Sequence, residues 1–189
     1  MNIPNLLTIL RVILTPLLII LLIHERYDLA FVVFVVAGVS DGLDGFLARV
    51  LKQKTRLGAV LDPLADKALL ASSYITLAIM DKIPDWLAVT VISRDVIIVL
   101  GVLILLLMRS RVEISPSILS KLTTLMQLIT IFVVLLNQLF PQDLSALVDA
   151  LFAVTALLTV ASGLHYIWLG IQLVGNGNNG GNDDLSRRA

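Results

Sequence analysis

The chain has 189 residues, of which 58% are hydrophobic and 15% are charged, and it contains no cysteine. Soluble domains carry about 25% charged and about 45–50% apolar residues, so this composition is typical of an integral membrane protein. Fourteen basic and fourteen acidic residues balance, which excludes nucleic-acid binding through general basicity. The lack of cysteine excludes a disulfide scaffold, and the apolar content excludes a long disordered chain.

Six apolar runs are long enough to cross a bilayer, at about 20 residues per span. They are Leu6–Ile23, Leu29–Leu51, Leu57–Met80, Trp86–Met108, Ile118–Phe140 and Leu144–Val174. The sequence therefore predicts an all-α integral membrane domain over residues 1–174, with six transmembrane helices after a short N-terminal juxtamembrane segment. The first run is a poor signal peptide, because Pro16 interrupts it and no basic segment precedes it. Residues 175–189, rich in Gly and Asn, are expected to form a disordered tail.

Basic residues near the loops predict the orientation, because cytoplasmic loops are enriched in Lys and Arg. One side carries Arg49, Lys52, Lys54, Arg56, Arg109 and Arg111, whereas the turns on the other side carry Arg26 and Lys82. We expect both termini and the second and fourth loops in the cytoplasm, in a bacterial inner membrane or an organelle equivalent.

Four carboxylates lie inside the second and third apolar runs, near the end predicted to be cytoplasmic. Asp41 and Asp44 are spaced i, i+3, and Asp62 and Asp66 are spaced i, i+4, so each pair shares one helical face. Charged groups inside a span usually mark a functional site. Four converging acids require neutralising cations, and oxygen ligands select hard divalent ions such as Mg²⁺, Mn²⁺ or Ca²⁺. Helix caps and snorkelling acids are the plainer alternative.

The residues between these acids complete a recognisable pattern. The string Asp41-x2-Asp44-Gly45-x2-Ala48-Arg49-x8-Gly58-x3-Asp62-x3-Asp66 resembles the full signature of the CDP-alcohol phosphotransferase family, over nearly the whole chain. The resemblance implies a homodimeric enzyme that binds two divalent cations, Mg²⁺ or Mn²⁺, at the cytoplasmic membrane face. It also implies transfer of a phosphatidyl group from CDP-diacylglycerol to an alcohol, with release of CMP.

The resemblance assigns roles by position. Asp41, Asp44 and Asp62 are expected to bind metal, and Asp66 to act as general base and further metal ligand. CDP-lipid contacts are expected from Asn5, Thr8, Gly45, Ala48, Arg49 and Gly58. Asn5 also fits a helix N-cap.

Three basic residues are candidates for binding the acceptor. Arg94 and Lys121 are suited to a phosphate, and Arg94 also fits a buried pair with an Asp. Arg11 lies in an apolar run and requires a partner, for which a phosphate and a structural ion pair are alternatives.

The N-terminal segment, residues 2–11, resembles the glycerol-phosphate and cardiolipin branches of the family and suits either acceptor. We expect glycerol 3-phosphate, which is the more frequent acceptor in the family, with phosphatidylglycerol as the alternative. Bacterial phosphatidylglycerophosphate synthases usually have a second Lys where this chain has Thr123, and commonly Glu where it has Asp95. Both differences favour the alternative.

A divalent-cation transporter is a more remote alternative. Its ionisable groups would lie near the midplane of the membrane, whereas these acids are predicted near one face. A purely structural membrane subunit does not explain the energetic cost of four acids inside the membrane. The single polar residues Gln127, Thr130, Ser162 and His165 are predicted to make helix–helix contacts.

Overall fold

The computed structural model describes the backbone of residues 3–50, 56–107, 117–140 and 144–186, and the side chains of 9–40, 65–101, 117–140, 144–170 and Gln172. The described part of the chain contains six α-helices and no strand, as the sequence predicts. They are α1 Ile3–Ile23, α2 Tyr27–Val50, α3 Arg56–Ile79, α4 Asp85–Leu107, α5 Ile118–Leu139 and α6 Ser145–Ser186. Each of these helices covers most of one of the six apolar runs.

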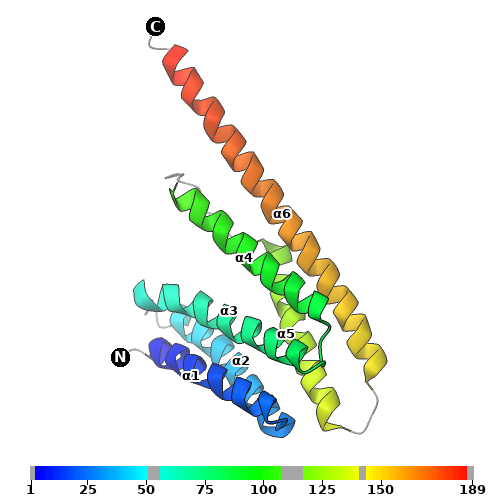
Figure 1. Cartoon of the computed structure of the whole chain (residues 1–189). Coiled ribbons are helices and arrows are strands. Elements are labelled where there is room, and N and C mark those ends of the chain that lie inside the picture. The colour runs from blue at the N-terminus through cyan, green and yellow to red at the C-terminus, as the bar shows by residue number, and fades with distance from the viewer. Residues whose placement is uncertain (1–2, 51–55, 108–116, 141–143, 187–189) are drawn as a thin grey trace.

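The pairs α1–α2, α3–α4 and α5–α6 pack together, and the α1–α2 turn, the α3–α4 turn, the end of α5 and the start of α6 lie at the same end of the bundle (Figure 1). The first two turns use one geometry. Glu25 and Asp81 each adopt φ 56°, two residues after the last residue of a helix. The next amide reaches back to a carbonyl of the last turn, Arg26 N to Leu21 O at 2.9 Å and Lys82 N to Leu77 O at 2.9 Å. This is the Schellman cap, which satisfies carbonyls left over at a helix end.

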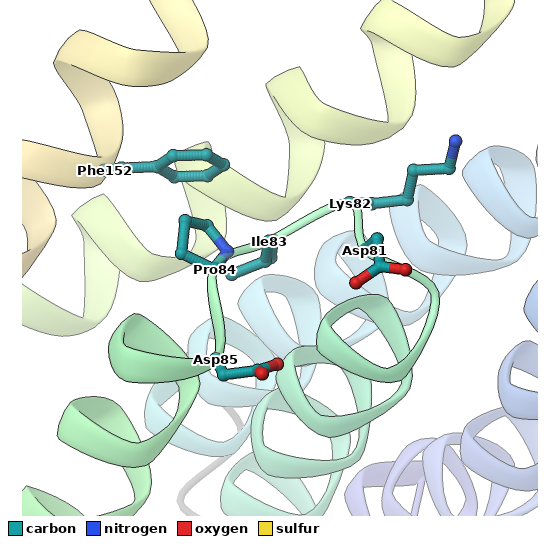
Figure 2. A pocket seen from close by; sticks show the side chains of 6 residues that line it. All are labelled: Asp81, Lys82, Ile83, Pro84, Asp85 and Phe152. Carbon is teal, nitrogen blue, oxygen red and sulfur yellow. The ribbon is translucent and has the colours of Figure 1, made fainter.

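Helix α1 packs against both α2 and α3, while α5 and α4 each pack against α6. Contacts of α3 with α4 and of α2 and α3 with α5 join the two groups. Among the described side chains, the shared core includes Leu22, Phe34, Tyr74, Leu87 and Leu135. Figure 2 shows the Phe152 ring of α6 facing Pro84 of the α3–α4 turn. This turn therefore lies against α6, beside a pocket of about 350 Å³.

The outward faces of the helices are also apolar. Ile79 is 78% exposed, Leu157 72% and Val89 62%. Two helical segments, Ile118–Leu139 and Ser145–Gly170, are long and apolar enough to cross a membrane, and Ile9–Ile23 and Tyr27–Ser40 are shorter apolar segments.

Helix α6 continues to Ser186, so it includes the segment after residue 174 that composition predicts to be disordered. Once a long apolar segment has nucleated a helix, each further residue adds one hydrogen bond and requires the ordering of only that residue. Each glycine opposes this by about 1 kcal/mol relative to alanine. The division of the chain at residue 174 stays a prediction.

A row of buried polar side chains joins α5 to α6. Gln127 donates to Thr159 at 3.3 Å, and the Thr130 and Thr155 hydroxyls lie 2.7 Å apart. Thr123 donates to the Leu158 carbonyl at 3.1 Å. The predicted helix–helix contacts of Gln127 and Thr130 are therefore confirmed, and the α5–α6 pair is fixed in register.

We expect Thr155→Val to lower the melting temperature of the purified protein, because Thr130 loses its partner across the helix pair. Such bonds in membrane proteins contribute about 0.6 kcal/mol on average. The double variant Thr130→Val/Thr155→Val should recover most of the loss, since no buried hydroxyl then lacks its interhelical partner. Thr90→Val is the matched control, because Thr90 bonds only to Trp86 of its own helix. A double variant less stable than either single one would contradict this account.

Candidate active site

The four predicted acids lie on two helices that are both held by α1. Asp41 and Asp44 belong to the second half of α2, and Asp62 and Asp66 to the first half of α3. The side chains of Asp41, Asp44 and Asp62 lie outside the described residues. Among the side chains that are described, no three His, Cys, Asp or Glu come together. The meeting of the four carboxylates stays a prediction, and Asp66 is the member whose surroundings are described.

The Asp66 carboxylate forms an ion pair with Arg11 of α1, through Oδ1 and Nη1. The Arg11 side chain is fully buried, whereas that of Asp66 remains 37% exposed. The sequence left two alternatives for Arg11, a phosphate ligand and a structural ion pair, and the structure contains the ion pair. Arg11 is thereby placed beside the predicted general base, and its predicted role in binding the acceptor stays a prediction.

A second ionic cluster begins at the next residue of α3. Lys67 Nζ lies 3.0 Å from Asp95 Oδ1, and Arg94 Nη1 donates to the same oxygen at 2.7 Å. Arg94 Nη2 donates to Ser120 of α5 at 2.6 Å and to Ser162 of α6 at 3.0 Å. One carboxylate and one guanidinium therefore connect α3, α4, α5 and α6.

In this cluster Arg94 forms a buried pair with an Asp, which the sequence offered as the alternative to phosphate binding. The Arg94 side chain is only 5% exposed. It also confirms the predicted helix contact of Ser162. Sequence reasoning missed Lys67. The signal was available, because a lysine inside an apolar run requires a carboxylate, and Asp95 was the matching acid on another run.

The remaining basic candidate lies differently. Lys121 is exposed on α5, one residue after the Ser120 that receives Arg94. Thr123, which stands where a second lysine is common in bacterial synthases, is buried against α6. His165 is exposed on α6 beside Tyr166 and Trp168, so its predicted helix contact is not among those described.

The predicted CDP-lipid residues lie on α1 and on the two helices that carry the acids. Their side chains lie outside the described residues, and their backbone is helical: Asn5 and Thr8 in α1, Gly45, Ala48 and Arg49 in α2, and Gly58 in α3. Beside Arg94, a groove of about 290 Å³ separates α4 from α6. Its lining is mostly apolar and includes Val89, Ile97, Val160, Leu164 and Ile167.

A family model described as CDP-alcohol phosphatidyltransferase matches residues 1–169. The chain belongs to this family. It is 36% identical over 189 aligned residues to the cardiolipin synthase (CMP-forming) of Rattus norvegicus, covering 92% of this chain and 63% of that protein. It is 33% identical over 177 residues to the CDP-diacylglycerol--glycerol-3-phosphate 3-phosphatidyltransferase of Aquifex aeolicus, covering 92% of this chain and 98% of that protein. A probable phosphatidylglycerophosphate synthase of Mycobacterium tuberculosis is 32% identical over 181 residues.

The chain thus spans 63% of the length of the cardiolipin synthase and nearly all of the Aquifex transferase. The family generally uses divalent metal ions. Asp66 fits such an ion, because its carboxylate stays 37% exposed while Arg11 holds one of its oxygens. Carboxylate oxygens are the ligands that Mg²⁺ and Mn²⁺ prefer.

We expect Asp95→Asn to destabilise the protein strongly, because it leaves Lys67 and buried Arg94 without their shared countercharge. Breaking a buried pair costs about 3–5 kcal/mol, and the lower end applies because the Lys67 side chain is 34% exposed. Thermal unfolding in detergent measures the effect. Asp28→Asn is the control, since Asp28 pairs with Arg26 at an exposed turn, and it should leave the melting temperature unchanged. Equal melting temperatures for the two variants would show that the cluster does not hold the helices together.

Proposed function

We propose that this family member transfers a phosphatidyl group from CDP-diacylglycerol to glycerol 3-phosphate, giving phosphatidylglycerophosphate and CMP. The observation that carries the proposal is the eight-residue motif from Asp41 to Asp66, which lies within the region matched by the family model. The names of the relatives support both this reaction and its cardiolipin-forming alternative.

In the proposed reaction, an acceptor hydroxyl oxygen bonds to the lipid-side phosphorus as the bond from that phosphorus to the CMP oxygen breaks. Asp66 accepts the hydroxyl proton, a role for which its 37% exposure leaves it accessible and its contact with Arg11 positions it. Asp41, Asp44, Asp62 and Asp66 would hold two divalent cations, Mg²⁺ or Mn²⁺, which neutralise pyrophosphate charge when bound. Asn5, Thr8, Gly45, Ala48, Arg49 and Gly58 would bind the CDP-lipid.

We further propose a multi-pass membrane setting with six spans. The exposed apolar faces support it, since a surface with side chains such as Ile79 and Leu157 more than 70% exposed suits lipid rather than water. The shared end of the α1–α2 turn, the α3–α4 turn, the end of α5 and the start of α6 supports the predicted alternation of loops (Figure 1). In this proposal the acids belong to the opposite, cytoplasmic end. The proposed assembly is a homodimer.

The alternative acceptor is phosphatidylglycerol, as in cardiolipin synthases. Two observations favour it. Thr123 donates a hydrogen bond from α5 to α6, and Asp95 forms the ionic cluster with Lys67 and Arg94. The apolar groove beside Arg94 is also compatible with a lipid acceptor. Against it, glycerol 3-phosphate is the acceptor named for the relative that this chain matches over nearly its full length.

We expect the purified protein to release CMP from CDP-diacylglycerol in the presence of Mg²⁺ and glycerol 3-phosphate. Phosphatidylglycerol is offered in a separate reaction, and release there alone would make the alternative the acceptor. Asp66→Asn should abolish release while CDP-lipid binding stays measurable, because the proton acceptor is lost. Its melting temperature must be compared with wild type, since Asp66 also pairs with Arg11. Undiminished turnover in this variant would remove Asp66 as the base. Cation movement across vesicles without CMP release would support the transporter instead.

Arg49→Ala should weaken CDP-lipid binding by about tenfold, in line with about 1.5–3 kcal/mol for a hydrogen bond to a charged group. Binding of CDP-diacylglycerol in mixed micelles measures it. Arg26→Ala is the matched control, because Arg26 lies in the α1–α2 turn at the other end of the bundle. Unchanged affinity in Arg49→Ala would argue against a pyrophosphate contact.

A further inference from the structure

The pair between Arg11 and Asp66 joins a fully buried cation to a partly open carboxylate. Arg11 lies near the start of the apolar segment of α1, and its side chain has no exposed surface. A buried charge is tolerated only beside a countercharge, and removing that countercharge is strongly destabilising. Asp66, 37% exposed, remains accessible to a further ligand. The contact therefore restrains Asp66 without enclosing it.

The neighbouring charges do not supply this restraint. Lys67 adjoins Asp66 on α3, but its ammonium lies 3.0 Å from Asp95. Arg94 donates to the same Asp95 carboxylate and to two serines. Among the described cations around the start of α3, Arg11 is thus the one that contacts Asp66.

We propose that Arg11 is a resident counter-cation and positioning residue for Asp66. It holds the carboxylate in place when no divalent cation is bound, and it lowers the affinity of the site for that cation. The reason is electrostatic: a guanidinium on a ligand carboxylate competes for its oxygen and repels an incoming divalent ion. This inference rests on the proposed function, because it takes Asp66 to be part of a cation site.

The test is Mn²⁺ binding by the full chain in detergent, followed through the electron paramagnetic resonance signal of free Mn²⁺. Arg11→Gln should bind Mn²⁺ about tenfold more tightly than wild type, on the order of one unit charge removed from a partly exposed site. Arg11→Lys keeps the charge and should bind as wild type does. Arg26→Gln is the matched control, since it removes an arginine from an exposed pair with Asp28, and its affinity should not change.

Thermal unfolding gives a second readout. Without Mn²⁺, Arg11→Gln should melt below wild type, and saturating Mn²⁺ should raise its melting temperature by more than it raises that of wild type. In an Asp66→Asn background, Arg11→Gln should raise the affinity by less than it does in wild type, because the competition for the Asp66 oxygen is already lost and only the repulsion remains. If Arg11→Gln alone does not fold, the double variant with Asp66→Asn should accumulate, since neither unmatched charge remains.

Unchanged or weaker Mn²⁺ affinity in Arg11→Gln, with a lower melting temperature at every Mn²⁺ concentration, would overturn the inference and leave Arg11 a packing role. A double variant that also fails to accumulate would overturn it too. These results differ from a failure of the proposed function, in which wild type itself would neither bind Mn²⁺ nor release CMP.

Discussion

The arrangement of the candidate site depends on neutralising charge inside an apolar helical bundle. Arg11 is fully buried in α1, and its partner Asp66 belongs to α3. Since α1 also packs against α2, the helix that carries Arg11 touches both acid-bearing helices. A single ion pair therefore ties the proposed base to a helix that packs against both, and the requirement for a countercharge makes this pairing specific.

The same requirement organises the other half of the molecule. Asp95 neutralises both Lys67 and Arg94, and Arg94 extends the polar contacts to Ser120 and Ser162. The α5–α6 row of hydroxyls and amides continues from there. Contacts between apolar helix surfaces in lipid have little directional preference, so directional polar contacts fix the register of the helices. The groove between α4 and α6 lies beside this ionic cluster, at Arg94.

Much of the fold could be predicted from the sequence. Each apolar run became one helix, because runs of about twenty apolar residues can satisfy their backbone only within themselves. Single polar residues such as Gln127 and Thr130 were correctly expected at helix contacts. Lys67 was missed, because its meaning depends on Asp95, an acid on another helix. The extent of α6 also differs from expectation, because composition reports propensity whereas a helix propagates from its neighbours.

The sequence by itself determined the family, through residues whose spacing along two helices is fixed by the helical period. It also predicts the chemistry for the same reason, since four acids at i, i+3 and i, i+4 intervals on two consecutive helices would select hard cations. The tertiary structure alone decided which cation meets which acid. Arg11 was compatible with a phosphate or a carboxylate, and the packing of α1 on α3 gave it Asp66. Helical periodicity places a residue on a face, but only the packing of helices distant in sequence brings two faces together.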